Sequence, residues 1–295
     1  MSRTLNRKDP AVFKTLALCV EAHAGGLSYH GTGEPLNFAQ MSQRRQPLSV
    51  DNPEAFALKL ANLGVSVRLT LNWSGHDHWL VVRQLRPDRG DTVLKLISGY
   101  VPAHELNLPL LTATQEVAEE CLIETPSGWL AGRFAGNWLP TPYQEQLHHR
   151  EDCHFELQPL SGSALPVCAG SQPLLERPRA YVHTPTASLQ LVYDMRLRLP
   201  REAHQPSLHH VDETLENGQL VARLPWRKLD AYLIPLEHNL PTGELLSLRR
   251  GQLHAVSTRN LYLSESFCAH RGWLIEAEHI AWKDWLKDCC PTGPG

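Results

Sequence analysis

Residues 99–123, GYVPAHELNLPLLTATQEVAEECLI, place three glutamates within one short segment, at Glu116, Glu119 and Glu120. Positions three and four apart share one face of an α-helix, so a helical conformation would direct all three carboxylates into one region. Apolar residues of the same segment also recur at helical spacing, at Leu110, Ala113, Val117 and Cys121. The pattern predicts an amphipathic helix from Leu111 to about Leu122.

Two interpretations of the three glutamates are open. In the first they form a solvated face, and the like charges of Glu116 and Glu120 cost roughly 0.2–0.5 kcal/mol. In the second they bind a divalent cation such as Mg²⁺, which prefers carboxylate oxygens and reverses the sign of that interaction. The residues around the helix decide between these interpretations.

Strand patterns come before the helix. Residues 66–73 (SVRLTLNW) alternate between polar and apolar residues with a period of two, which is typical of a half-buried strand. Two further apolar segments, 79–85 (WLVVRQL) and 92–97 (TVLKLI), follow the turn sequences SGHDH and PDRGD. We therefore expect three consecutive strands that lead into the helix.

The second half of the chain is also rich in predicted strands. Residues 126–185 contain many Pro, Gly, His and Ser residues and predict an irregular insertion or a set of short strands. Residues 188–199 (SLQLVYDMRLRL) give the strongest strand pattern of the chain. Shorter strands are predicted within 219–224, 243–251, 252–258 and 260–266, and a final helix within 277–289.

The first 65 residues predict an N-terminal extension with two helices. Residues 10–24 and 53–63 carry apolar stripes and end near glycines, and the GLSYHGTGEP sequence at 26–35 predicts a loop. Both helices are too small to fold alone, so we expect the extension to pack on the main domain. Taken together, strands, a central helix, more strands and a final helix indicate an α+β fold with a mixed or antiparallel sheet.

Composition excludes several classes of protein. The net charge of −3 gives no electrostatic reason to expect nucleic acid or an anionic membrane as a partner. The N-terminal MSRTLNRKDP lacks the apolar segment of a secretory signal, and no apolar run has the length of a membrane span. Seven cysteines without a CxxC pair indicate reduced thiols, so we expect a cytoplasmic protein.

The segment around the helix resembles the signature of the Nudix hydrolases, Gly-x5-Glu-x7-Arg-Glu-aliphatic-x-Glu-Glu-x-Gly-aliphatic. The resemblance is good from about residue 78 to 123. It departs from the family in four ways. Ser98 stands where the first of two glycines usually does, and nine residues rather than seven separate Glu105 from position 115. Gln115 replaces the Arg of the signature, and Leu122 replaces its second Gly. The matching positions are Gly99, Glu105, Glu116, Val117, Glu119, Glu120 and Ile123.

The resemblance implies a fold and a division of the chain. It predicts a Nudix-like α/β/α sandwich with a mixed sheet over residues 66–290, an N-terminal extension over 1–65, and an enlarged C-terminal half with the irregular insertion around 126–185. Because Leu122 disfavours the left-handed conformation that usually ends such a helix, the helix is free to continue toward Pro126.

The resemblance also implies a metal-dependent activity. Glu116, Glu119 and Glu120 would bind Mg²⁺ or Mn²⁺, with Glu105 as an accessory ligand. The ions would activate a water molecule for attack on the diphosphate of a nucleoside diphosphate linked to another group. Glu119 or Glu120 would act as the catalytic base. A Nudix-like module that binds a nucleotide metabolite or regulates another protein without hydrolysis is the alternative, favoured by the altered positions.

Other residues give weaker indications. Trp138 and Tyr143 follow the helix at a place where an aromatic side chain could stack on the base of a substrate. Histidine pairs such as His76 and His78, or His148 and His149, match no standard zinc module. The expected partner is a nucleotide-derived small molecule, without nucleic acid or membrane. The oligomeric state is open, a homodimer included.

Overall fold

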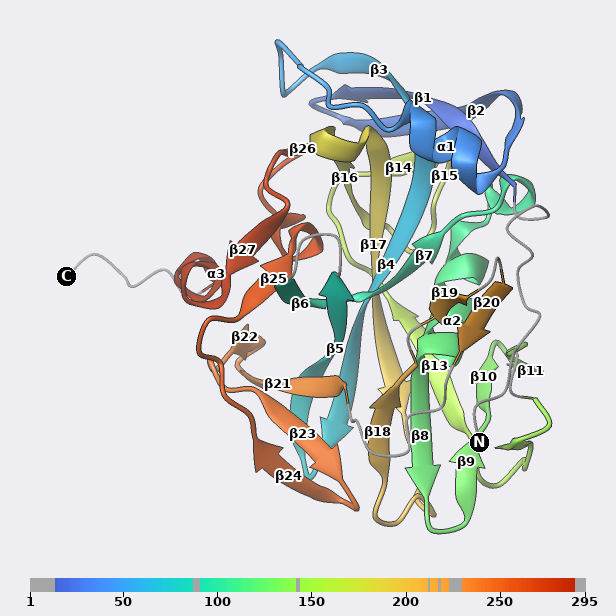
Figure 1. Cartoon of the computed structure of the whole chain (residues 1–295), viewed down its shortest axis with the longest axis vertical. Helices are drawn as coiled ribbons and strands as arrows, with labels where there is room; N and C mark the ends of the chain where they lie inside the picture. The colour runs from blue at the N-terminus through green and yellow to red at the C-terminus, as the bar shows by residue number, and fades with distance from the viewer. Residues whose placement is uncertain are drawn as a thin grey trace.

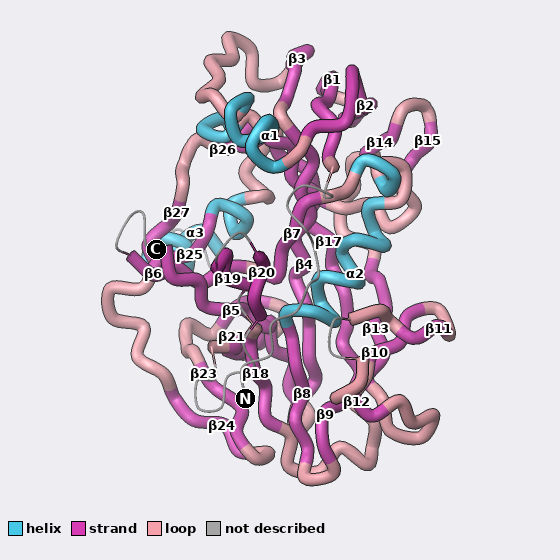
Figure 2. Tube along the Cα trace, turned by 45° about the vertical axis from the view of Figure 1, so that its right-hand side comes forward, coloured by secondary structure: helices cyan, strands magenta, loops and turns pink. Residues whose placement is uncertain are grey.

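Strands dominate the structure, a computed structural model that describes residues 14–86, 91–141, 144–211, 213–216, 219–222 and 230–289 (Figure 2). None of the helices in these ranges has the length and apolar character needed to cross a membrane. The α-helices of the described residues are α1 (Phe38–Arg44), α2 (Pro109–Glu120) and α3 (Trp282–Cys289). The fold is therefore of the mixed α+β class, as predicted.

A mixed sheet forms the centre of the molecule. Its middle strands, β4 (Asn62–Trp73) and β17 (Ser188–Arg198), run parallel along ten paired positions, although they are far apart in sequence. β5 (His76–Arg86) pairs antiparallel with β4, and β13 (Phe155–Leu160) pairs antiparallel with β17. These strands confirm the predictions for residues 66–73, 79–85 and 188–199.

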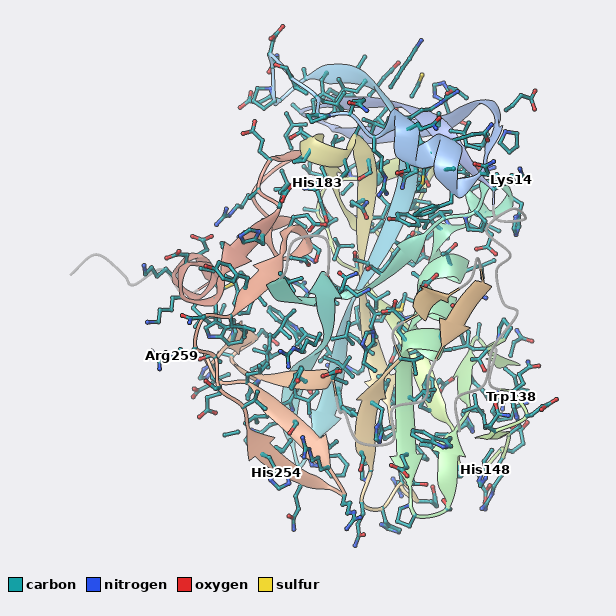
Figure 3. The ribbon with its side chains drawn as sticks, in the orientation of Figure 1. Lys14, Trp138, His148, His183, His254 and Arg259 are labelled. Atoms are coloured by element: carbon teal, nitrogen blue, oxygen red, sulfur yellow. The ribbon has the colours of Figure 1, made fainter. Side chains whose placement is uncertain are left out.

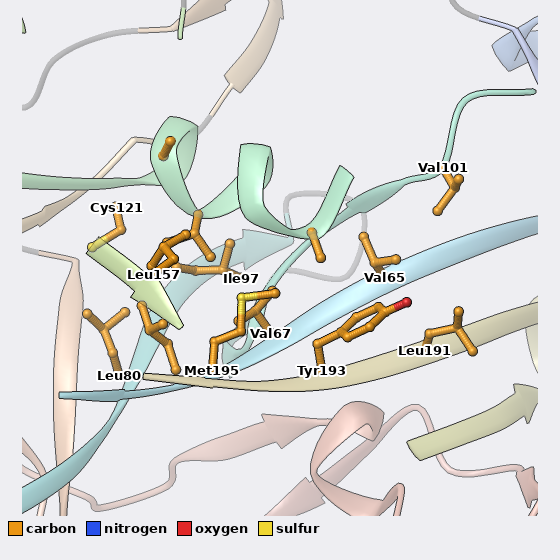
Figure 4. Packing of buried hydrophobic residues seen from close by; sticks show 14 of the residues in the cluster. Val65, Val67, Leu80, Ile97, Val101, Cys121, Leu157, Leu191, Tyr193 and Met195 are labelled. Atoms are coloured by element: carbon orange, nitrogen blue, oxygen red, sulfur yellow. The ribbon is translucent and has the colours of Figure 1, made fainter. Parts of the chain in front are cut away.

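Alternating side chains give the central sheet two buried faces. Val65 and Val67 of β4 and Leu191 and Met195 of β17 are fully buried in the core that also contains apolar residues of α2 (Figure 4). Val192, which points the other way, belongs to a second core together with tryptophans of α3. Figure 1 accordingly shows α2 on one side of the β4–β17 pair and α3 on the other.

The strands that lead into α2 bend across the sheet. β6 (Asp91–Lys95) pairs with β5, and β7 (Ile97–Tyr100) continues the chain to pair with β4. The predicted strand at 92–97 is therefore divided at Leu96 between two partners. Lys95 ends β6, and Gly99 lies in β7, which contacts α2.

The N-terminal segment forms strands rather than the predicted helices. β1 (Thr15–His23) pairs with β2 (Gly26–Leu36) and with β3 (Phe56–Leu60), and β2 pairs in parallel with β14 (Val167–Ala169). The helices predicted at 10–24 and 53–63 and the loop at 26–35 are therefore wrong where described; residues 10–13 lie outside the described ranges. Pairing on both edges of β1 outweighs the local helical pattern.

The C-terminal end of α2 also differs from the prediction. The helix ends at Glu120, and the following residues form β8 (Cys121–Thr125), which pairs antiparallel with β18 (Ser207–His210). The expected continuation to Leu122 or toward Pro126 is therefore wrong. Extended backbone at Cys121 lets Leu122 and Ile123 join a buried strand instead.

The remaining elements are mostly short strands. Residues 126–185 contain several of them, which confirms the prediction of short strands for that segment. The helix predicted at 277–289 begins only at Trp282, because residues 279–281 form a strand. The other strands are β9 (Gly128–Leu130), β10 (Gly132–Phe134), β11 (Asn137–Trp138), β12 (Leu147–His148), β15 (Gln172–Pro173), β16 (Arg179–His183), β19 (Glu213–Glu216), β20 (Gln219–Ala222), β21 (Ala231–Glu237), β22 (Leu240–Pro241), β23 (Leu246–Arg249), β24 (Gln252–Ala255), β25 (Tyr262–Ser264), β26 (Leu274–Ile275) and β27 (His279–Ala281). The 3₁₀-helices are η1 (Ala103–Glu105), η2 (Thr184–Thr186) and η3 (Glu265–Cys268).

Two buried tyrosines of the core allow a matched test of their hydroxyl groups. Tyr29 donates a hydrogen bond to the carbonyl of Leu106 at 2.8 Å, whereas the Tyr193 hydroxyl has no hydrogen-bond partner among the described residues. We expect Tyr29→Phe to lower the free energy of unfolding by about 1 kcal/mol, and Tyr193→Phe to leave it unchanged or raise it slightly. Urea unfolding measures both. A loss of about 1 kcal/mol in Tyr193→Phe would contradict the prediction and indicate a buried water on that hydroxyl.

Candidate functional site

Helix α2 holds its glutamates against the protein rather than in solvent. Pro109 occupies the first helical turn, where its missing N–H costs no hydrogen bond. Val117 packs fully buried in the main core, and the glutamates of the same helix lie beside it. Glu116 is 7% exposed and Glu119 is 3% exposed. The interpretation of these glutamates as a solvated face is therefore wrong.

Glu116 packs against the backbone of β7 at Gly99. A Cβ atom added to Gly99 would lie 2.2 Å from the Cδ and Oε1 atoms of Glu116, far closer than van der Waals contact allows. Gly99 therefore gives the carboxylate the space that it occupies. Gly99 and the first of the three glutamates of the helix are thus in direct contact.

Glu119 and Glu105 each accept a hydrogen bond from a nearby side chain. Gln115 Nε2 donates to Glu119 Oε1 at 2.8 Å, so the residue that replaces arginine contacts one of the carboxylates. Thr112 Oγ1 donates to Glu105 Oε2 at 2.5 Å. These contacts orient the two carboxylates separately, one along the helix and the other toward its first turns.

Glu120 lies between two basic side chains. Its Oε1 atom is 3.4 Å from Lys95 Nζ, and its Oε2 atom is 3.6 Å from His210 Nε2. The side chains are 16%, 12% and 1% exposed for Glu120, Lys95 and His210. Burial alone would raise the pKa of Glu120, but Lys95 and His210 outweigh it and lower that pKa. Glu120 is therefore ionised and paired with the ammonium group of Lys95.

The carboxylates on and near α2 contact different partners. Among the described residues, no three His, Cys, Asp or Glu side chains lie close enough together to bind one ion. Glu116 lies against Gly99, Glu119 accepts a hydrogen bond from Gln115, and Glu120 faces Lys95. Binding of Mg²⁺ or Mn²⁺ by Glu105, Glu116, Glu119 and Glu120 thus stays a prediction.

Trp138, predicted to bind substrate, packs against residues other than those of α2. Its ring makes edge contacts with His149 and His154, with centroids 5.2 and 5.4 Å apart, and Arg133 lies 5.0 Å from its centroid. Figure 3 shows Trp138 near His148, well away from His183. These ring neighbours come from β10 and the 149–154 segment, not from α2. Tyr143 lies outside the described residues.

A polar cavity on the other side of β7 was not predicted. It has a volume of about 510 Å³, and Lys95 and Gly99 form part of its wall. It is therefore separated from the carboxylates only by the short segment that carries these two residues. The rest of its lining comes from distant parts of the sequence and follows no motif, among them Arg45, His183 and Gln190.

Buried histidines make the stability of the fold depend on pH. Burial is the largest cause in each case, and it lowers the pKa below the ordinary value of 6.5 for His78, His183, His209 and His270. The unfolded chain therefore binds more protons than the folded one below about pH 6.5. The free energy of unfolding consequently decreases as the pH is lowered below that value.

We expect the midpoint of urea unfolding to be lower at pH 5.5 than at pH 7.5. Replacement of His78, which is 2% exposed, by glutamine should reduce this difference, whereas replacement of the exposed His254 should not. Equal midpoints at the two pH values would contradict the prediction.

Comparison with models of known protein families gives no match to this chain, and comparison with curated proteins gives no similar sequence.

Proposed function

We propose that this chain is a Nudix-like module that binds a nucleotide-derived small molecule without hydrolysing it. The observation that carries this choice is the position of Glu120, which faces Lys95 and His210. A metal ion at Glu120 would have to compete with the ammonium group of Lys95, which the fold already supplies. Gln115 and Leu122, which differ from the signature of the hydrolases, also favour binding over turnover.

Mg²⁺-dependent hydrolysis of a nucleoside diphosphate linked to another group is the second candidate. Its support is the retention of Glu116, Glu119 and Glu120 on one face of a single helix, with Glu116 in contact with Gly99. Hydrolysis would require Glu120 to leave Lys95 and turn toward Glu116 and Glu119. In that case Glu119 or Glu120 would be the base that accepts a proton from water.

One experiment compares the two candidates. The protein is incubated with ADP-ribose, NADH, a dinucleoside polyphosphate, a nucleotide sugar and nucleoside triphosphates, each with Mg²⁺ or Mn²⁺. Chromatography measures product, and thermal unfolding measures stabilisation by each compound. Glu120→Gln tests the helix, and Glu124→Gln is the matched control, because Glu124 pairs with His209 on β18 instead.

For a binding module, we expect at least one compound to raise the unfolding temperature of the wild type without product. Product formation that Glu120→Gln abolishes and Glu124→Gln retains would establish the hydrolase and refute the binding-only proposal. A folded protein that shows neither product nor stabilisation by any compound would refute both candidates.

A further inference from the structure

The cavity behind β7 is lined mainly by polar side chains, with a buried histidine among them. His183, at the end of β16, is 7% exposed and lines the cavity. Its Nδ1 atom is hydrogen-bonded to Thr186 Oγ1 at 2.8 Å, whereas its Nε2 atom has no hydrogen-bond partner among the described residues. A buried imidazole nitrogen without a partner is costly, so a ligand group that bonded to it would remove that cost.

Hydroxyl and amide groups continue from this histidine along β17. Thr186 Oγ1 and Ser188 Oγ are 2.8 Å apart, and Gln190 Nε2 donates to Ser188 Oγ at 3.0 Å. The network is fixed in place, because the Gln190 amide packs on Gly64, where an added Cβ would lie 2.4 Å from Oε1. This wall therefore presents an ordered row of groups that can both donate and accept hydrogen bonds.

A second set of polar groups comes from β25 and η3. Ser264 and Ser266 are both buried, with their hydroxyl oxygens 2.7 Å apart, and Glu265 accepts a hydrogen bond from Tyr181 at 3.3 Å. All three residues at 264–266 line the cavity. Serine hydroxyls and a carboxylate oxygen suit a ligand that presents several hydroxyl groups of its own.

The basic side chains of the lining already interact with other residues of the protein. Lys95 pairs with Glu120, and Glu265 and Glu278 also line the cavity, so the lining does not favour an anion. Arg45 is also committed to the protein, since it donates to Asn62 Oδ1 and lies 4.8 Å from the centroid of the Tyr100 ring. The volume of about 510 Å³ lies within the range of roughly 300–1,000 Å³ that small-molecule sites occupy.

We propose that this cavity binds an uncharged, hydroxyl-rich ring of the size of a pentose or hexose, with a ligand hydroxyl bonded to His183 Nε2. The hydroxyl, amide and imidazole groups of the lining match the vicinal hydroxyls of a sugar, and basic side chains that already interact with the protein do not select a phosphate. The ring is either a free sugar or the sugar of a nucleoside or nucleotide sugar. The site does not depend on any reaction at α2.

Saturation-transfer NMR with the full-length protein tests the proposal, using ribose, glucose, adenosine and UDP-glucose as probes. We expect at least one probe to bind the wild type, with saturation strongest on the protons of its sugar ring. His183→Leu removes the free nitrogen, and Ser66→Phe fills the cavity from β4, where Ser66 is buried. Each should weaken binding at least tenfold. His254→Leu, on the exposed strand β24, is the control and should bind as the wild type does.

Three results would overturn the proposal. The first is a folded wild type that binds none of the four probes. The second is undiminished binding in folded Ser66→Phe, which covers the case in which His183→Leu does not fold. The third is binding that Glu120→Gln abolishes and His183→Leu retains, because it would place the ligand at α2. If ribose or glucose binds as tightly as adenosine, the sugar ring alone is the ligand. If UDP-glucose binds more tightly than the free sugars, the ligand is a sugar linked to a nucleotide.

Discussion

Replacement of Lys95 by methionine is expected to lower the free energy of unfolding by about 3 kcal/mol, because removal of one member of a buried ion pair leaves the other charge poorly compensated. Lys95 is 12% exposed and lies 3.4 Å from Glu120. His210 remains near Glu120 in the variant and limits the loss. Urea unfolding at pH 7.5 measures the change.

A double-mutant cycle isolates the pair. Glu120→Gln alone and Lys95→Met combined with Glu120→Gln complete the cycle, and the combined variant should be more stable than Lys95→Met alone. If Lys95→Met costs less than about 1 kcal/mol, the pair behaves as a solvent-exposed one. Glu120 would then be available to a metal ion, and hydrolysis would become the better-supported of the two candidate functions.

The second large effect concerns Gly99. We expect Gly99→Ala to lower the free energy of unfolding by about 1–3 kcal/mol, the usual range for overpacking of a filled site. The added methyl group would lie 2.2 Å from Glu116 Oε1 and 2.7 Å from its Cγ, so the whole glutamate side chain would have to move. Urea unfolding again measures the loss.

The glutamate itself provides the control for this substitution. In a Glu116→Ala background the obstructing atoms are absent, so Gly99→Ala should cost much less than it does in the wild type. Additive effects of the two substitutions would contradict the prediction. They would indicate that Gly99→Ala destabilises the protein through the backbone of β7 rather than through the Glu116 side chain. Gly99→Ala should also change any metal or nucleotide binding at α2, because it displaces Glu116.

The parts of the fold that local patterns predicted are those where local and tertiary preferences agree. β4 and β17 alternate with a period of two, and both faces of the sheet are covered, so the predicted strands form. Residues 53–63 show the opposite case: FALKLANL contains good helix formers, yet β3 pairs with β1 there and Asn62 begins β4. Strand pairing between distant segments decides such places, and no local pattern reveals it.

The candidate site likewise contains residues that a local pattern predicted and residues that it did not. Glu116, Glu119 and Glu120 were visible because helical spacing links them within five positions. Their partners were not, because Lys95 and His210 come from β6 and β18 and meet Glu120 only in the folded sheet. The polar cavity could not be predicted for the same reason, since His183 and Arg45 share neither a motif nor a spacing. Prediction of such sites requires knowledge of which strands are neighbours.

The parallel pairing of β4 with β17 also has a consequence for synthesis of the chain. Paired residues such as Arg68 and Asp194 are 126 positions apart. At about 5–20 residues per second, β17 leaves the ribosome roughly 6–25 s after β4. During that interval β4, one of the most apolar strands, has no permanent partner on one edge and is exposed to association with other nascent chains. Chains that end before Ser188 are thus expected to aggregate or to depend on chaperones.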